Sequence, residues 1–270
     1  MLIWLPPSEG KNAPESGPCL SLESLSCPSL TTARRAVADA LVALGSGPQA
    51  AATLKVGARI DLSVNEVLDT APCAPASSLF TGVLFEAIEA VAPGAWQCSG
   101  ATSVSVFSGL FGVLSPADLI PDHRLAMGVS LPGFGVLSTW WAPRLDEALR
   151  EEASGQVVID ARSGPYRAAC KAPWARVWEL RVVREADGTR SVISHDAKRW
   201  RGAVTGTLLA SGGAHATETR ECERAVAEAA RSVTLTDARG AEHRVIDVEF
   251  GPEMGTKQGG ARRALTLVTN

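Results

Sequence analysis

The sequence predicts a single α+β domain in which one mixed sheet is surrounded by helices. Three observations lead to this class. The chain has 270 residues, 46% of them apolar, which is enough to fill one large core. Strand-like and helix-like segments alternate without the regular βαβ rhythm of a doubly wound or barrel fold. No repeat or clean linker divides the chain, so we expect one domain over residues 1–250 and a C-terminal extension over 251–270.

The expected strands are short apolar or alternating runs. Residues 2–5 form an apolar run, and residues 102–107 alternate and are rich in β-branched side chains. Asp187-Gly188 is a strong turn signal and predicts a hairpin. The expected strands cover residues 2–5, 102–107, 156–160, 176–184, 189–194, 232–236 and 243–250. The final apolar run, residues 264–269, is typical of an edge strand.

The expected helices carry apolar side chains on one face. In residues 31–44 three such side chains share a face, and Thr31 or Thr32 can cap the first turn. The expected helices cover residues 31–44, 62–68, 80–91, 138–150, 197–209 and 217–231, with a short helical stretch around Leu54.

Composition excludes several classes of protein. A net charge of −3 argues against a strongly basic nucleic-acid binder, although it leaves a local basic patch open. No run approaches the ~18 apolar residues of a membrane-spanning helix, and the first residues are typical of a strand, not a signal peptide. The six cysteines are scattered, as in a cytoplasmic protein with reduced thiols. No metal or cofactor is expected, because no cluster of metal-ligating residues is visible.

Three polar loops follow apolar strands and predict the functional site. They cover residues 6–11, 108–112 and 160–166. If the three strands run parallel in one sheet, their loops converge at its carboxyl edge, where ligands bind in sheets of this kind.

The first loop combines Ser8, a flexible glycine and Lys11 in one turn. This combination suits an anion or a phosphate group, although the sequence is not a Walker A motif. The alternative is an ordinary turn with a solvated lysine.

The third loop places Asp160, Arg162, Ser163 and Tyr166 within seven residues. Arginine suits bidentate capture of carboxylate or phosphate, and Ser163 or Tyr166 could transfer a proton. The alternative is that Asp160 and Arg162 form a structural ion pair that braces a turn.

A basic helix start supplies further candidates. His195 can cap the first turn, and Lys198 and Arg201 share one face of the helix. We interpret this face as a cationic wall for an anionic ligand. The alternative is an exposed basic helix end.

Residues 108–128 are punctuated by glycines and prolines and predict a buried, bent connection. Its expected polar anchors are Asp118, His123 and Arg124. Ser108 lacks the nucleophile elbow of a hydrolase and is expected to be an anchor. Asp118 is expected to brace Arg124 or backbone amides.

Several ordered motifs resemble those of the YaaA family of peroxide-stress proteins, in the form typical of its actinobacterial members. The likeness covers most of residues 2–248. The motifs are Leu5-Pro-Pro-Ser-Glu-Gly-Lys11, Ser108-Gly-Leu-Phe-Gly112 with Arg124-Leu-Ala-Met-Gly128, Asp160-Ala-Arg-Ser-Gly-Pro-Tyr166, and Ser194-His195 followed by Ala-Lys198 and Arg201-Gly202.

The resemblance implies a mixed α/β fold with a positively charged cleft, in a bacterial cytoplasmic protein that limits oxidative damage by hydrogen peroxide. It also implies DNA binding through a helix-hairpin-helix-like element within about residues 33–70. Here the hairpin lacks the family's Gly-hydrophobic-Gly signature, and its basic residues are Arg34, Arg35, Lys55 and Arg59.

Two functions follow. The first is a peroxide-stress protein that binds DNA or another phosphate-bearing ligand through Lys11, Arg162, Lys198 and Arg201. The second is an enzyme that acts on a small anionic, nucleotide-like or carboxylate ligand. Its catalytic candidates are Asp160, Ser163, Tyr166 and Lys11. The remaining candidate ligand contacts are Ser8, Ser108, Arg124 and His195.

Overall fold

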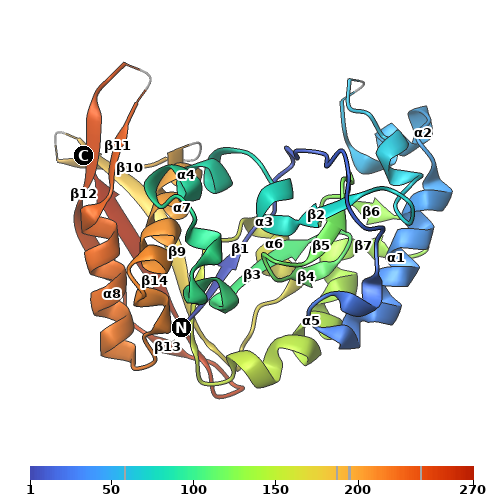
Figure 1. Ribbon diagram of the computed structural model, residues 1–270. Coiled ribbons are helices and arrows are strands. Elements are labelled where there is room, and N and C mark those ends of the chain that lie inside the picture. Colours follow the sequence, from blue (N-terminus) through green and yellow to red (C-terminus); the bar gives the residue numbers. More distant parts are fainter. Residues whose placement is uncertain (58, 187, 194–195, 238) are drawn as a thin grey trace.

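The structure is a computed structural model that describes residues 1–57, 59–186, 188–193, 196–237 and 239–270 (Figure 1). Its strands are β1 (Leu2–Leu5), β2 (Cys73–Pro75), β3 (Val104–Ser108), β4 (Gly112–Leu114), β5 (Leu119–Pro121), β6 (Ser130–Leu131), β7 (Gly135–Val136), β8 (Val157–Asp160), β9 (Arg176–Ala186), β10 (Thr189–Val192), β11 (Thr234–Thr236), β12 (Glu242–Phe250), β13 (Met254–Gly255) and β14 (Ala261–Thr269). Its helices are α1 (Thr31–Leu44), α2 (Pro48–Leu54), α3 (Ala76–Leu79), α4 (Val83–Val91), α5 (Leu137–Ala153), α6 (Gly164–Ala169), α7 (Asp196–Ala210) and α8 (Thr219–Ser232).

Among the described residues, ten strands form one mixed sheet. Eight of them follow the order β11-β12-β14-β9-β8-β1-β3-β4, while β10 pairs with β9 and β13 with β14. The single α+β fold predicted from the sequence is therefore confirmed. The predicted hairpin pairing is also present, since β9 pairs antiparallel with β10, although Asp187 of its turn lies outside the described residues. A second antiparallel pair is formed by β11 and β12.

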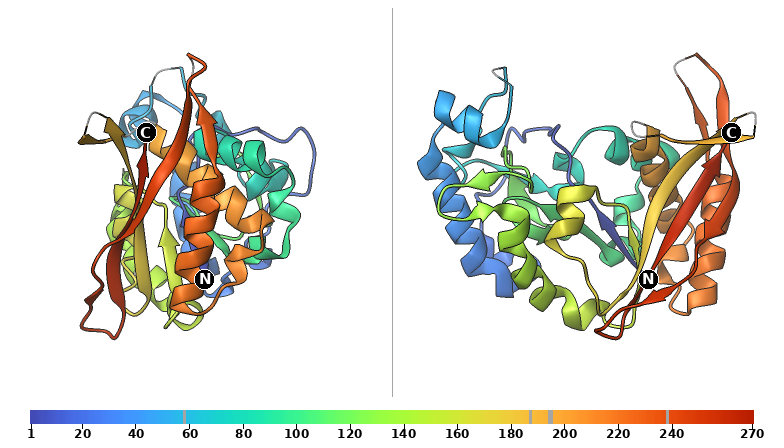
Figure 2. Two further views of the ribbon diagram at one scale, coloured as in Figure 1. Left: turned by 90° about the vertical axis from the view of Figure 1, so that its left-hand side faces the viewer. Right: turned by 180° about the vertical axis from the view of Figure 1, so that it is seen from behind.

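The helices lie in two groups along the sheet (Figures 1 and 2). One group contains α4, α7 and α8, with α7 against β9 and α8 against β12. The other group contains α1 and α5 and lies toward the β4 end, where α5 contacts β4. The core runs through both groups, because Trp4 in β1, Trp141 in α5, Trp178 in β9 and Trp200 in α7 are all buried.

Three local expectations are wrong. Residues 62–68 form a short 3-10 turn over Ser63–Asn65, where the buried Asn65 side chain binds the backbone of a distant segment. Neither Thr31 nor Thr32 caps α1, because the 3-10 turn Pro28–Leu30 leads directly into the helix and places Leu30 at its N-cap. The helix expected from residue 80 begins at Val83, after Gly82 with φ of 102°.

The C-terminal strand is interior. β14 lies between β9, to which it is parallel, and β12, to which it is antiparallel. The edge position expected for this segment is therefore wrong. The division into a domain over residues 1–250 and an extension over 251–270 stays a prediction.

Candidate functional site

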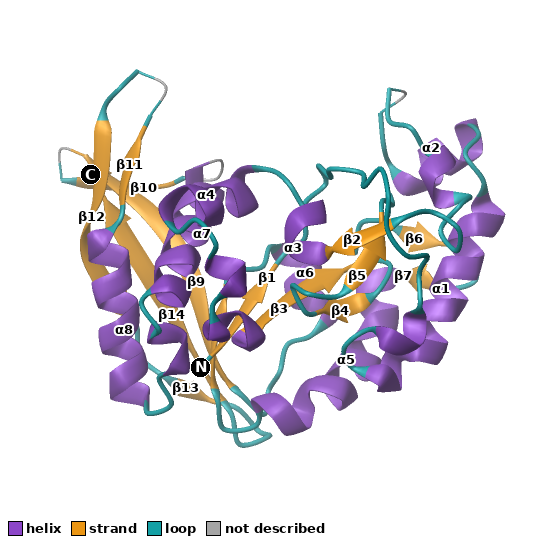
Figure 3. Cartoon of the chain, in the orientation of Figure 1, coloured by secondary structure: helices purple, strands orange, loops and turns teal. Residues whose placement is uncertain are grey.

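The three polar loops meet because their strands are parallel neighbours. β1 pairs in parallel with β8 on one side and with β3 on the other. The loops that follow these strands therefore leave the same edge of the sheet, as the sequence suggested (Figure 3).

A cavity of about 910 Å³ lies at this edge. Six of the candidate site residues line it: Ser8, Lys11, Ser108, Arg124, Ser163 and Tyr166. The lining does not include Asp160, Arg162, Lys198 or Arg201, and His195 lies outside the described part of the chain.

The first loop holds Lys11 in a fixed place. The backbone of Lys11 forms a β-bridge with Phe80, and its ammonium group lies 5.6 Å from the centre of the Phe80 ring. The Nζ atom donates hydrogen bonds to the carbonyl oxygens of Ser8 (3.2 Å) and Glu9 (3.5 Å). Burial and the nearby Arg124 lower the pKa of Lys11 from 10.5 to about 8, although two carboxylates oppose this shift.

The second loop is built around Ser108 and Gly109. The Ser108 hydroxyl accepts hydrogen bonds from the backbone N–H groups of Leu110 and Phe111, both at 3.2 Å. A Cβ atom on Gly109 would lie 2.5 Å from the carbonyl oxygen of Leu125, so only glycine fits there. Ser108 therefore stabilises the turn that brings this loop against the segment carrying Arg124.

The segment with Arg124 is held by buried polar groups. Arg124 forms an ion pair with Asp122, and its backbone N–H donates to the Asn65 side chain at 2.7 Å. Asp118 does not contact Arg124: its carboxylate accepts hydrogen bonds from Ser26 and from the backbone of Ser115. The expected buried connection is therefore present, with Asp118 bracing backbone amides.

His123 is a neutral wall of the cavity. Its Nδ1 atom lies 2.9 Å from the carbonyl oxygen of Pro121, and its ring packs edge-on against Phe80 and Phe111. Complete burial, together with the nearby Lys11, holds the pKa of His123 well below its usual 6.5.

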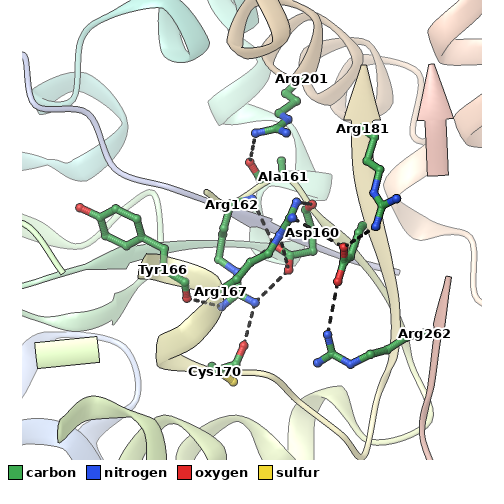
Figure 4. Close-up of polar contacts among 10 residues, drawn as sticks. Asp160, Ala161, Arg162, Tyr166, Arg167, Cys170, Arg181, Arg201 and Arg262 are labelled. Atoms are coloured by element: carbon green, nitrogen blue, oxygen red, sulfur yellow. Dashed lines mark hydrogen bonds and ion pairs between the residues drawn. The ribbon is translucent and has the colours of Figure 1, made fainter. Parts of the chain in front are cut away.

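The third loop is anchored by the ion pair between Asp160 and Arg162 (Figure 4). Both residues are 1% exposed, and Nε of Arg162 lies 2.8 Å from Oδ1 of Asp160. The guanidinium also donates to the carbonyl oxygens of Tyr166 and Cys170, and it lies over the rings of Trp4 and Phe107, which contact each other. Burial opposes ionisation of Asp160, but Arg162 and Arg167 hold its pKa below 3.8.

Tyr166 leaves this network and reaches the cavity. Figure 4 shows its ring pointing away from the arginines, while its carbonyl oxygen accepts the bond from Arg162. Burial raises the pKa of Tyr166 to about 12, and a backbone hydrogen bond at Met127 partly offsets this effect. The phenol is therefore protonated at physiological pH.

A second set of cations lies outside the cavity lining. Glu179 pairs with Arg167 at 3.6 Å, Arg181 at 3.1 Å and Arg262 at 3.5 Å. Nearby, Arg201 on α7 donates to the carbonyl oxygen of Ala161 at 3.3 Å (Figure 4).

Part of the cavity wall was not predicted from the sequence. Glu9, Lys55, Arg59 and His123 also line the cavity. Lys55 and Arg59 follow α2 and are exposed. In the sequence, these two basic residues flank a glycine, which could have indicated a basic turn. Only the fold shows that this turn reaches the carboxyl edge of the sheet. Among the described residues, no cluster of three or more potential metal ligands is present.

These features define an α+β protein with a ligand-sized cavity, lined by apolar and charged side chains, at the carboxyl edge of its parallel strands. The family model described as "Peroxide stress protein YaaA" matches residues 1–225. The chain therefore belongs to the YaaA family of peroxide stress proteins.

Three relatives support this assignment. A UPF0246 protein of Streptomyces coelicolor is 41% identical over 220 residues, which are 78% of this chain and 84% of the relative. A UPF0246 protein of Corynebacterium efficiens is 35% identical over 244 residues, 87% of this chain and 94% of the relative. One from Corynebacterium glutamicum is 36% identical over 217 residues, 78% of this chain and 86% of the relative. In the part of the chain that the structure describes, no helix is both long and apolar enough to cross a membrane.

Proposed function

We propose that this YaaA-family protein serves the cytoplasmic response to hydrogen peroxide by binding a phosphate-bearing ligand, DNA or a nucleotide, in its cavity. One observation carries the proposal. The described lining contains four basic side chains, Lys11, Lys55, Arg59 and Arg124, against one acidic side chain, Glu9. Such an excess of cations favours phosphate groups.

The size of the cavity limits the kinds of ligand that it can hold. Its 910 Å³ falls within the range of about 300–1,000 Å³ common for small-molecule sites. A single nucleotide fits this range, so DNA would enter through an end or an unstacked nucleotide. Hydrogen bonds would come from Ser8, Ser163 and Tyr166. Lys198 and Arg201 would meet phosphates of a longer strand.

Arg162 would act indirectly. Its guanidinium is buried and already bonded to Asp160 and to two carbonyl oxygens. We therefore assign Arg162 and Asp160 to positioning the loop that carries Ser163 and Tyr166.

A second candidate function is catalysis on a small anionic or nucleotide-like substrate. It is favoured by two side chains that line the cavity, a lysine with a pKa of about 8 and the Tyr166 phenol. A lysine that titrates near neutral pH can act as a base or a nucleophile.

A salt-series titration tests the binding proposal. Fluorescence anisotropy would be measured with labelled duplex, single-stranded and branched DNA, with nucleotides as competitors. The double variant Lys55→Gln with Arg59→Gln should bind more weakly, with a salt slope lower by about one per lost phosphate contact. Both residues are exposed, so folding should be preserved.

The matched control is Arg220→Gln with Arg244→Gln, two exposed arginines on α8 and β12. This control should bind like the unaltered protein. Equal weakening in both double variants, or no binding of DNA and nucleotides at low salt, would overturn the proposal.

A further inference from the structure

Lys11 has an unusual environment for a lysine. Its neighbours Gly10 and Asn12 are tied by backbone hydrogen bonds to Thr81 and Leu79, at 3.0 and 2.8 Å. Within the described chain, no carboxylate lies within 4.0 Å of its Nζ atom, whose partners are two backbone carbonyl oxygens. Lys11 is therefore a positioned amine on the wall of a cavity, and the carboxylates of Asp122 and Glu9 act on it only at longer range than an ion pair.

This environment favours the neutral amine. Burial removes water from the ammonium group, and the positive charge of Arg124 repels it, so the pKa of Lys11 falls to about 8. About a quarter of the Lys11 side chains are then uncharged near pH 7.5, compared with roughly one in a thousand for an ordinary lysine. An uncharged amine is the nucleophile that attacks carbonyl carbon.

The same cavity supplies groups for the other end of such a ligand. Arg124, Lys55 and Arg59 line it as phosphate partners, and the protonated Tyr166 phenol can donate a hydrogen bond to an oxygen atom. The amine and the phosphate-binding cations thus face one space of nucleotide size.

We propose that Lys11 condenses with the carbonyl group of a phosphate-bearing aldehyde or ketone bound in this cavity and forms an imine. The inference rests on the proposed phosphate site. An abasic nucleotide in DNA and a free pentose phosphate both present this chemistry.

The step balances without any further reactant. The Nζ lone pair forms a bond to the carbonyl carbon, and the C=O π electrons move to oxygen. That oxygen takes a proton from nitrogen, which gives a carbinolamine. Loss of the hydroxyl group with a second nitrogen-bound proton releases water and leaves the C=N bond. No oxidant or reductant is consumed, and water reverses the step.

Borohydride trapping tests the proposal. The full chain would be incubated near neutral pH in two arms, with ribose phosphate or with an oligonucleotide containing one abasic site. Borohydride reduces any imine to a stable amine, and peptide mass spectrometry locates it. In at least one arm Lys11 should be labelled about tenfold more than the surface lysines, since its larger neutral fraction outweighs its lower basicity. The labelling rate should reach half its maximum near the pKa of Lys11, about 8.

Two variants accompany the test. Lys11→Arg should abolish the adduct, whereas Lys257→Arg, at an exposed lysine outside the cavity lining, should leave it unchanged. Thermal melting would establish that both variants are folded, and the peptide map of the unaltered protein identifies Lys11 independently of either. The arm in which the adduct forms shows whether the carbonyl group comes from DNA or from a free sugar phosphate.

Uniform labelling of the lysines, or no adduct in either arm, would overturn the imine. The unreactive analogues, ribitol phosphate and an oligonucleotide with a reduced abasic site, separate this failure from failure of the phosphate site. If an analogue binds but no lysine adduct is trapped, only the proposed imine is rejected. If neither analogue binds, the result argues against the phosphate site as well.

Discussion

Asp160 and Arg162 are buried together although they belong to a loop. Their charges satisfy each other, and Arg162 additionally closes the loop by bonding to the backbone of Tyr166 and Cys170. From the sequence, both residues were predicted to belong to the site, with a structural ion pair as the alternative. The two interpretations could not be separated from sequence, because they differ only in burial.

Replacement of Asp160 should destabilise the fold strongly. Asp160→Asn leaves the Arg162 charge buried without its partner, and we expect a loss of about 3–5 kcal/mol in the free energy of unfolding. Urea denaturation monitored by tryptophan fluorescence measures it. Glu242→Gln, which breaks an exposed ion pair with Arg244, should change stability by less than about 1 kcal/mol.

The contribution of Asp160 to the free energy of unfolding should also depend on pH. The folded-state pKa of this carboxyl is lowered, so its stabilisation is present above the unfolded value of about 3.9. The difference between the unaltered protein and Asp160→Asn should therefore persist at neutral pH and shrink only below about pH 4. A difference that vanished near pH 6 would contradict the ion pair.

His123 should make stability fall in mild acid. Its pKa is lowered in the folded state, so the unfolded chain binds a proton first as the pH falls. Below about pH 6.5 the free energy of unfolding should drop by up to about 1.4 kcal/mol per pH unit. His123→Asn, which can keep a donor near Nδ1, should flatten this slope. His215→Asn, at an exposed histidine, should leave it in place.

At the scale of elements, α4 and α7 approach closely because α7 carries glycines on the contact face. A Cβ atom on Gly202 would lie 2.1 Å from the carbonyl oxygen of Leu84, and one on Gly206 would lie 2.8 Å from that of Ile88. The backbone atoms that oppose them cannot rotate away as side chains can.

Gly202→Ala should therefore destabilise the protein despite the better helix propensity of alanine. We expect a loss of about 2 kcal/mol or more from overpacking, against a gain of about 1 kcal/mol from propensity. Gly255→Ala, where no atom lies within 4 Å of the added carbon, serves as the control. Unchanged thermal melting of Gly202→Ala would contradict this helix contact.

Periodicity predicted the long elements well. The helices α1, α5, α7 and α8 and the strands β1, β3 and β8 all lie where their patterns indicated. Features that depend on contacts between distant parts of the chain could not be predicted, and this includes the roles of single residues. Arg34 is an example: it was counted among the basic residues of a possible DNA-binding hairpin, but it is buried and bonded to the carbonyl oxygens of Phe111 and Val113.

At the scale of the whole molecule, the sheet ties the chain's distant parts together. β14 contributes Leu265 and Leu267 to the core and pairs along its length with β9. Its interior place could not be read from the sequence, because an apolar alternating run looks the same at an edge and inside a sheet.

Removal of residues 251–270 should therefore unfold more than the extension. Both β9 and β12 would lose a neighbouring strand, and the apolar face beneath α8 would be exposed. We expect hydrogen exchange of β12 and α8 to approach that of an unfolded chain, with aggregation of the product. Full protection of β12 in the shortened chain would contradict this account.

The position of the cavity follows from the same sheet. Three loops far apart in the sequence converge because β8, β1 and β3 are parallel neighbours, and this convergence could be predicted from the order of strands and polar loops. The turn after α2 could not be predicted to line the cavity, because its position depends on the packing of α2 against the distant strand β6.

The most direct test of the phosphate site is hydrogen exchange of the full chain with and without a saturating 5′-phosphorylated oligonucleotide. We expect slower exchange in the segments that line the cavity, residues 8–12, 54–57, 59–60, 108–112, 123–129 and 163–167, with β12 and β14 unchanged. Slower exchange confined to α8, β12 and β14, or no change at saturation, would contradict a phosphate site at the carboxyl edge of the sheet.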